Sequence, residues 1–545
     1  MQPEYKNAEK ENWIWWKHGI IYQIYPRSFY DSGGDGIGDI QGIIEKLDYF
    51  SYLGIDAVWL SPVNVSPMHD FGYDICDYRD IDPVFGTLHD FDSLIKNAHR
   101  RGIRLIMDLA LNHTSYLHPW FVESSSSINN PKRSWYIWHS GNNGKPPNNW
   151  ISAFFGSAWE WHEPTGQFYM HSFLKEQPDV NWRDPELKQA MFNVLRFWLD
   201  RGVDGFRLDV VNWFIKDERF RNNRFSLNPF SNKIEKYNRN RPETHNIFKE
   251  IRKLINKYND RMLVGEVFCY PPGDPSFSAS FLGNGEDELH LTFDFSLMYK
   301  NWNALKFYHC IKHWFSHIPD TGWPCNVLSN HDQPRNYNRC GNNNSTSEKQ
   351  AKVSAVLLLT LRGTPFIYYG EEIGMKNFRI PRSKIADPAG KKFWPLYIGR
   401  DCARTPMQWS SEKNAGFTTG NVWLPVCMDY KKVNVKNQAH DKYSLLNFYR
   451  KVIKIRKQKM CLTHGTWKAV SKGLYGILAY IREYKEETIC VVLNFTKKPQ
   501  TLNAGHRGQW KVLFSTHRTP NEHFVSLHFK LYPYEASIIE KIGIL

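Results

Sequence analysis

The sequence has no long apolar run and no cysteine pattern that would stabilise a small secreted fold. Its longest mostly apolar segment, residues 353–361, ends at Arg362 and is too short to span a bilayer. Residues 1–19 carry charges throughout and lack the apolar core of a secretory signal. The 9 cysteines are scattered singly without a CxxC pair, which is typical of reduced thiols. We therefore expect a cytoplasmic protein with no membrane partner.

The composition excludes a disordered chain, a coiled coil and a collagen-like fibre. The chain has 545 residues, 41% hydrophobic, 23% charged and 15% aromatic, enough to bury a large core. The net charge is +15 and raises the question of an anionic partner. Many of the lysines and arginines fall within residues 431–459, in a segment whose apolar positions follow a helical period. We therefore expect a solvated basic surface and no nucleic-acid partner.

Short apolar runs alternate with helical patterns along most of the chain. Helical periodicity is clear in residues 94–100 and 190–199. The strand-like runs are residues 19–25, 55–60, 104–109, 205–209, 262–266, 289–295, 325–328 and 365–369. Such alternation predicts a parallel α/β fold, and the strand count favours a (β/α)8 TIM barrel.

Two stretches do not fit a simple barrel. The connection after the third strand is long and rich in Ser, Asn, Pro and Trp, which predicts an inserted domain over the barrel's carboxyl face. The last part of the chain has short strands separated by turn residues, which predicts a small β-sandwich. The predicted units are the barrel in 1–113 and 181–463, the inserted domain in 114–180 and the C-terminal domain in 464–545.

Polar residues follow several of the predicted strands at the end where a barrel builds its active site. The fourth strand gives Arg207 and Asp209, the fifth gives Glu266, and the seventh leads to His331 and Asp332. Paired carboxylates of this kind suit glycoside hydrolysis, with one as nucleophile and the other as general acid and base. Arg207 is expected to lower the pKa of Asp209, and partial desolvation is expected to help Glu266 hold its proton.

Seven motifs spread over the chain resemble glycoside hydrolase family thirteen, the α-amylase superfamily, and within it the exo-acting α-glucosidase and oligo-1,6-glucosidase branch. They are IYPRSF at 24–29, DLALNH at 108–113, QPDVN at 177–181, GFRLD at 205–209, VGEV at 264–267, NHD at 330–332 and RTPMQW at 404–409. The resemblance implies a barrel with an inserted domain B and a C-terminal β domain. It implies Asp209 as the nucleophile, Glu266 as the acid/base and Asp332 as a stabiliser of the transition state.

The same resemblance implies how one glucose unit is bound. The residues that it places around the sugar are Asp70, His113, Arg207, His331 and Arg400. The high aromatic content adds Tyr73, Phe154 and Phe173 as candidate stacking faces for sugar rings. In the exo-acting branch, the residues matching Asp70 and Arg400 close the site around the sugar's non-reducing end. We therefore expect a retaining α-glucosidase that removes one glucose at a time from maltose or short malto-oligosaccharides, with some transglucosylation. The partner is then a small neutral saccharide, and the protein a monomer or homodimer.

A glycine-rich loop at residues 31–39 resembles the calcium or magnesium loop of the branch. Hard cations prefer oxygen ligands, and the expected ligands are Asp31, Gly33, Asp35, Ile37 and Asp39, the glycine and isoleucine through their carbonyls. Gly33 departs from the commoner Asn of relatives and reduces the number of side-chain ligands. Any ion here would be structural, and no organic cofactor is expected.

Linkage preference is left open by the sequence. Val210, next to the expected nucleophile, accompanies α-1,6 cleavage in this branch, whereas residues 228–232 and 241–244 resemble α-1,4-active α-glucosidases with transfer activity. The alternatives are an oligo-1,6-glucosidase and a trehalose-6-phosphate hydrolase, whose phosphate a basic site would suit. A non-catalytic, transporter-associated homologue is a remote alternative that would lack the carboxylates and carry a membrane span.

Overall fold

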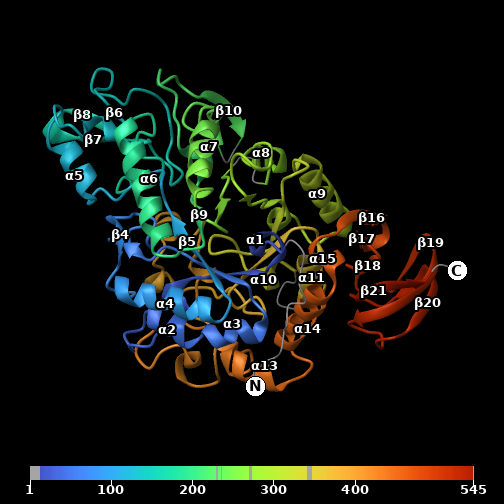
Figure 1. The fold of residues 1–545 in the computed structure, drawn as a ribbon. Coiled ribbons are helices and arrows are strands. Elements are labelled where there is room, and N and C mark those ends of the chain that lie inside the picture. Colours follow the sequence, from blue (N-terminus) through green and yellow to red (C-terminus); the bar gives the residue numbers. More distant parts are fainter. Residues whose placement is uncertain (1–12, 229–230, 235, 269–272, 341–346, 544–545) are drawn as a thin grey trace.

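A computed structural model describes residues 13–228, 231–234, 236–268, 273–340 and 347–543. Eight parallel strands form its central sheet, in the order β13-β12-β9-β5-β2-β1-β15-β14 (Figure 1). They are β1 Ile21–Ile24, β2 Ala57–Leu60, β5 Arg104–Leu109, β9 Gly205–Leu208, β12 Met262–Gly265, β13 Leu291–Thr292, β14 Cys325–Val327 and β15 Thr364–Tyr368. The predicted (β/α)8 barrel is confirmed.

The barrel is nearly closed between its first and last strands in hydrogen-bonding order. Across this seam, the Cys325 thiol in β14 donates to the carbonyl of Thr292 in β13 at 3.0 Å. The strand predicted over residues 289–295 is reduced to the two residues of β13, which pair only with β12 among the described strands. Because the eight strands are parallel, their carboxyl ends lie at one mouth of the barrel.

Helices cover the outside of the barrel, and several of them begin at a capping side chain. The larger ones are α4 Leu88–Arg100, α6 Pro185–Asp200, α7 Thr244–Ile255, α9 Ala304–His317, α11 Ser347–Thr360 and α14 Leu445–Gln458. Thr87 and Asp90 form a capping box at the start of α4, and Asp184 accepts two backbone N–H groups at the start of α6. The helical periodicity found at residues 94–100 and 190–199 is thus confirmed in longer helices.

The segment between β5 and α6 forms its own small unit, which projects beside α6 in Figure 1. It contains α5 Pro119–Ser126 and an antiparallel sheet of β6 Trp138–His139, β8 Gln167–Met170 and β7 Trp159–His162. His113 and Asp179 form an isolated bridge where the segment leaves and rejoins the barrel.

A β-hairpin that was not predicted from the sequence follows β9. Its strands are β10 Arg224–Asn228 and β11 Ser231–Ile234, which pair antiparallel. Residues 229–230 of the motif at 228–232 lie outside the described residues.

The predicted all-β C-terminal unit is confirmed. Its strands are β16 Thr466–Lys472, β17 Ile477–Tyr484, β18 Glu487–Asn494, β19 Gln500–Ser515, β20 His523–Leu531 and β21 Ala536–Gly543. They form one hydrogen-bonded sheet instead of the two of the predicted sandwich. The reason is β19, which pairs with both β20 and β21 and has register irregularities with each, where a strand bends. Ile477 and Ile481 of β17 therefore pack in one cluster with Leu527 and Leu531 of β20.

The opposite face of this sheet belongs to the barrel's core. Leu478 and Tyr480 of β17 lie in the same hydrophobic cluster as Val356 of α11. Arg482 of β17, fully buried, donates to the carbonyl of Thr360 at 2.5 Å, where α11 ends. The alternation along β17 therefore divides its side chains between two cores.

The solvated basic surface expected within residues 431–459 does not include Arg456 of α14. Its neighbours Val452 and Ile453 face inward as expected, but Arg456 is also fully buried and donates to the carbonyls of Leu359 at 2.9 Å and Gly363 at 2.8 Å. Carbonyl groups at a helix end need such donors. None of the helices in the described part of the chain is long and apolar enough to cross a membrane.

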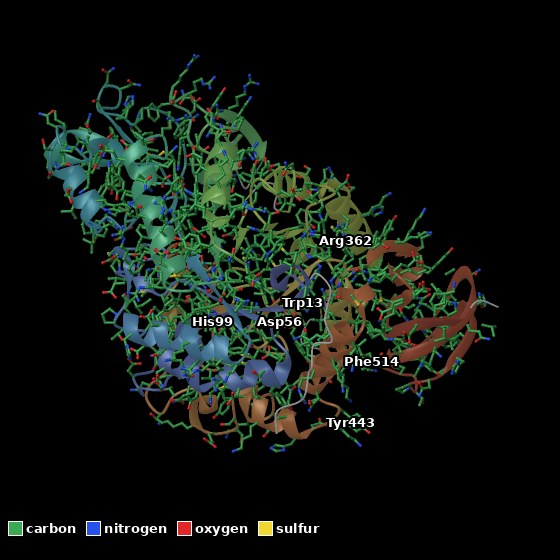
Figure 2. The ribbon with its side chains drawn as sticks, viewed as in Figure 1. Trp13, Asp56, His99, Arg362, Tyr443 and Phe514 are labelled. Atoms are coloured by element: carbon green, nitrogen blue, oxygen red, sulfur yellow. The ribbon has the colours of Figure 1, made fainter. Side chains whose placement is uncertain are left out.

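Asp204 marks the other end of β9 from the site. It precedes the strand, is fully buried, and pairs with Nε2 of His99 at 2.6 Å and with Nη1 of Arg104 at 2.9 Å (Figure 2 labels His99). Its role is therefore to anchor the amino end of the strand, away from the barrel mouth.

Candidate active site

Three neighbouring carboxylates lie where strands of the barrel end. Asp209 directly follows β9, Glu266 directly follows β12, and Asp332 comes five residues after β14. Asp209 and Glu266 are buried, whereas the Asp332 side chain keeps 26% of its surface exposed. The structure brings these three strand-end carboxylates together at one mouth of the barrel, as the sequence predicted.

Arg207 of β9 holds this cluster together. Its Nη1 donates to Oδ1 of Asp209 at 2.8 Å and to Oδ1 of Asp108 at 2.7 Å, and its Nη2 contacts Glu266. Burial opposes the charge of Arg207, but the surrounding carboxylates raise its pKa well above the ordinary value. The guanidinium therefore stays charged and fixes carboxylates from three strands in place.

Burial raises the pKa of both catalytic candidates. For Asp209, Arg207 acts in the expected direction and lowers the pKa, but burial outweighs it and the net pKa is raised. For Glu266, burial and the negative charges of Asp209 and Asp332 outweigh Arg207, so its pKa is also raised. Desolvation thus acts on Glu266 in the expected direction, toward holding a proton. The two carboxyl groups titrate as a coupled pair.

Asp332 has the opposite electrostatics. Its Oδ1 accepts from Nη2 of Arg404 at 2.7 Å and lies 3.3 Å from Nη1 of Arg400. Burial acts to raise its pKa, but His331 and the two guanidinium groups lower it well below the usual range. Asp332 is therefore a fixed negative charge at the mouth. Sequence reasoning gave Arg404 no role, although it begins the motif at 404–409.

Tyr73 and His331 line the floor of the site. The Tyr73 hydroxyl lies 2.7 Å from Nε2 of His331 and donates to Oδ2 of Asp108 at 3.0 Å. Gln23 of β1 lies 2.8 Å from the other ring nitrogen of His331. Burial lowers the pKa of His331 to about 3, so the ring is neutral at physiological pH. Asp108, which sequence reasoning also left without a role, is thus shared by Tyr73 and Arg207.

His113 and two phenylalanines form an adjoining wall. Nε2 of His113 lies 3.2 Å from the carbonyl of Tyr73, and burial lowers the pKa of this ring to about 4. The Phe173 ring lies 5.1 Å from that of His113, and the Phe154 ring lies 6.4 Å from that of Phe173. Neutral and aromatic surfaces of this kind suit the apolar face of a sugar ring.

Arg400 closes one side of the site. Its Nη2 donates to Oδ1 of Asp70 at 2.7 Å and to Oδ1 of Asp387 at 2.7 Å. Its guanidinium carbon also lies 5.6 Å from the centre of the Phe154 ring. Asp387 was missed from the sequence, because it lies in a loop whose position no strand pattern fixes. All the predicted substrate-binding residues are thus brought into one connected site.

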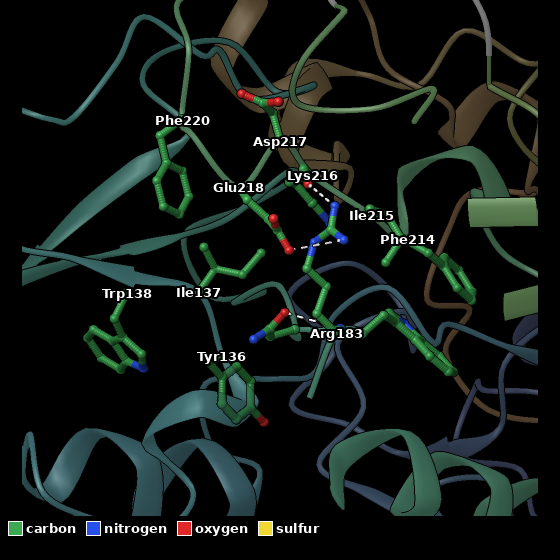
Figure 3. Close-up of a pocket in the computed structure, with 12 residues that line it drawn as sticks. Tyr136, Ile137, Trp138, Arg183, Phe214, Ile215, Lys216, Asp217, Glu218 and Phe220 are labelled. Atoms are coloured by element: carbon green, nitrogen blue, oxygen red, sulfur yellow. Dashed lines mark hydrogen bonds and ion pairs between the residues drawn. The ribbon is translucent and has the colours of Figure 1, made fainter. Parts of the chain in front are cut away.

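A separate pocket of about 340 Å³ lies between the inserted segment and the loop after β9. Figure 3 shows Arg183 in its middle, with Nη1 3.2 Å from Glu218 and Nη2 donating to the carbonyl of Lys216 at 3.1 Å. Lys216 itself is buried and pairs with Asp179 at 2.6 Å. The polar groups at this pocket's centre are thus paired within the protein, and its lining contains none of the three carboxylates.

The predicted metal loop folds around its own backbone. Asp31 accepts the amide N–H of Gly34 and of Gly36, both at 2.7 Å, and Asp35 accepts that of Ile37 at 2.8 Å. Asp39 caps α2 (Ile40–Glu45). Across the described residues, no three His, Cys, Asp or Glu side chains are arranged to hold a metal ion. The predicted ligand set also includes two backbone carbonyls, and the metal site at Asp31, Gly33, Asp35, Ile37 and Asp39 stays a prediction.

Comparison with known proteins decides the family. A model of the alpha amylase catalytic domain matches residues 23–465, and one of the maltogenic amylase C-terminal domain matches residues 468–538. The chain belongs to the α-amylase family. The resemblance drawn from the sequence motifs is therefore confirmed, and this α-amylase family member is a glycoside hydrolase.

Individual relatives span nearly the whole chain. It is 42% identical over 515 residues to an oligo-1,6-glucosidase of Parageobacillus thermoglucosidasius, in an alignment that covers 89% of this chain and 91% of the relative. It is 37% identical over 555 residues to a trehalose-6-phosphate hydrolase of Escherichia coli (strain K12), with 96% and 98% covered. The crystal structure of an alpha-glucosyl transfer enzyme superposes with a TM-score of 0.91 at 36% identity, covering 97% of this chain and 100% of that one.

Proposed function

We propose that this α-amylase family member is a retaining, exo-acting α-glucosidase that releases glucose from the non-reducing end of short α-glucosides. The observation that carries the proposal is the pair Asp209 and Glu266, two buried carboxylates at neighbouring strand ends that Arg207 contacts together, both with raised pKa values. A nucleophile and a general acid at a glycosidic bond need two carboxyl groups placed in this way.

In the proposed mechanism, ionised Asp209 attacks the anomeric carbon while Glu266 gives its proton to the departing glycosidic oxygen. The bond to the leaving sugar breaks and a glucosyl ester forms on Asp209. Glu266, now ionised, takes a proton from water, whose oxygen attacks the same carbon and restores the α configuration. A second sugar in place of this water gives transfer. Asp332 would stabilise the positive charge that develops on the sugar ring.

The exo mode rests on the ion pair between Asp70 and Arg400. Both side chains are largely buried, and Arg400 is also tied to Asp387 and Asp332. A charged bridge with this many partners leaves little room for a sugar beyond the one next to Asp209. The pocket then accepts one terminal glucose, and its two ionic groups face the hydroxyls of that residue.

For linkage, which the sequence leaves open, we propose a preference for α-1,6 over α-1,4 bonds. Val210 is buried directly after Asp209, at φ 38°, so its side chain is held in a fixed position by a strained backbone. The similarity to an oligo-1,6-glucosidase supports this choice. The similarity to a trehalose-6-phosphate hydrolase keeps that activity as the second candidate.

Initial rates on maltose, isomaltose, sucrose, trehalose and trehalose-6-phosphate test the proposal. We expect glucose from isomaltose at the highest kcat/KM, and glucose of retained α configuration by NMR at early times. Higher activity on trehalose-6-phosphate than on isomaltose would assign the second candidate instead. If none of the five substrates released glucose, the proposed function would be overturned.

The pH dependence of kcat/KM follows from the two raised pKa values. The active form has Asp209 ionised and Glu266 protonated, so activity falls as the pH drops through the pKa of Asp209 and as it rises through that of Glu266. Both limbs should lie at higher pH than two ordinary carboxyl groups would give. Rates on p-nitrophenyl α-glucoside at constant ionic strength measure this. An alkaline limb at the ordinary pKa of glutamate would contradict the assignment of Glu266.

A further inference from the structure

The tip of the inserted segment reaches across to the loop that follows the last barrel strand. Lys392 lies in α12, Pro388–Phe393, and its ammonium group donates to the carbonyl of Phe154 at 2.9 Å and to that of Phe155 at 3.2 Å. The Phe155 ring packs edge-on against that of Phe393, with 5.0 Å between centroids. One charged group and one ring pair thus join two parts of the chain that are more than two hundred residues apart.

Phe155 is held in an unfavourable conformation at this contact. Its φ is 63°, in the left-handed region that a bulky residue rarely adopts, and 57% of its surface is exposed. Such a residue persists only where its surroundings fix it, and these positions gather at functional sites. Here Lys392 and Phe393 are the contacts that link Phe155 to α12.

The contact continues into the glucose site. Phe154, whose carbonyl Lys392 binds, lies under the guanidinium of Arg400. The residue before α12, Asp387, is buried and binds the same guanidinium. Arg400 is therefore held from the inserted segment and from the start of α12, and Lys392 joins these two supports to each other.

We propose that Lys392 is a specificity-determining residue. By holding the tip at Phe154 and Phe155 against α12, it keeps the pocket closed beyond the terminal glucose and so restricts the enzyme to removing one unit at a time. The inference rests on the proposed α-glucosidase function and adds the element that closes its pocket. Lys392 touches no reacting group, so its effect is on which saccharides fit.

The test uses Lys392→Met, which keeps the length of the side chain and removes its charge and its donors. We expect KM for p-nitrophenyl α-glucoside to rise about threefold, because two hydrogen bonds that hold the tip are lost at an exposed position where water weakens them. The turnover number should stay within about twofold, because no group that acts on the bond is changed. Lys391→Met, in the neighbour that is exposed like Lys392 on the same helix, is the matched control and should leave both constants unchanged.

The deciding readout is the first product from p-nitrophenyl α-isomaltoside, whose α-1,6 bond matches the proposed linkage. The wild-type enzyme should release glucose first, and Lys392→Met should also release isomaltose together with p-nitrophenol, while Lys392→Arg restores glucose alone. Phe155→Gly, which suits the left-handed φ and removes the ring contact, should act like Lys392→Met and remain folded. Products and KM equal to those of Lys391→Met in both variants would overturn the role of Lys392. Isomaltose released by the wild type would instead overturn the proposed exo mode.

Discussion

Replacement of Asp209 by Asn should lower kcat on p-nitrophenyl α-glucoside by roughly 10⁴-fold or more, the range seen when a covalent nucleophile is removed. The amide keeps the shape of the side chain and can still accept the hydrogen bond of Arg207, which lies 2.8 Å from Oδ1. It cannot form the glucosyl ester. Steady-state release of p-nitrophenol measures the effect.

Asp204→Asn is the matched control for this result. It makes the same substitution at the other end of β9, where the carboxylate pairs with His99 and Arg104. We expect a lower melting temperature, because charged partners lose their buried counter-ion, but little change in kcat. If both variants lost activity equally, the loss in Asp209→Asn would reflect a damaged strand and not a missing nucleophile.

Glu266→Gln should lower the activity by different factors on different substrates, according to the leaving group. On isomaltose, whose sugar leaving group needs a proton, we expect kcat/KM to fall by about 10³-fold, within the usual range for general acid catalysis. On p-nitrophenyl α-glucoside the rate of the first step, formation of the glucosyl ester, should fall much less, because p-nitrophenolate leaves without a proton. The alkaline limb of the pH profile should disappear, since the group that titrates there is gone.

A trapped intermediate and a control variant would show that Glu266 is the acid and base. Without Glu266 as a base, water attacks the glucosyl ester slowly, so a burst of p-nitrophenol and a glucosyl adduct on the protein should be detectable by mass spectrometry. Glu288→Gln, in a buried glutamate that pairs with His245 at 2.8 Å, is the control and should show neither. An equal loss on both substrates would rule out Glu266 as the proton donor.

The barrel and most of the site could be predicted because both depend on local signals. Short apolar runs mark the strands, and a polar residue at the carboxyl end of a parallel strand can only point to the barrel mouth. Asp209 and Glu266 follow directly from this rule. Asp108 could have been found in the same way, since a carboxylate inside an otherwise apolar strand needs a charged partner.

What the sequence did not predict depends on long-range packing. Asp387 meets Arg400 only because a loop without strand or helix pattern folds back over the mouth. The net direction of the Asp209 pKa shift depends on how deeply the carboxylate is buried, because burial outweighs the lowering effect of Arg207 that the sequence indicated. Arg456 follows the period of a surface stripe, but its position at the junction with the C-terminal sheet buries it.

The C-terminal sheet and the barrel should unfold together in one cooperative transition. Leu478 and Tyr480 share a core with α11, and the Arg482 guanidinium binds the last carbonyl of that helix. Separation of the sheet would leave an apolar helix face in water and an unpaired carbonyl at its end. A barrel truncated before β16 is therefore an incomplete folding unit, and the small sheet, far from the carboxylates, determines whether the enzyme survives heating.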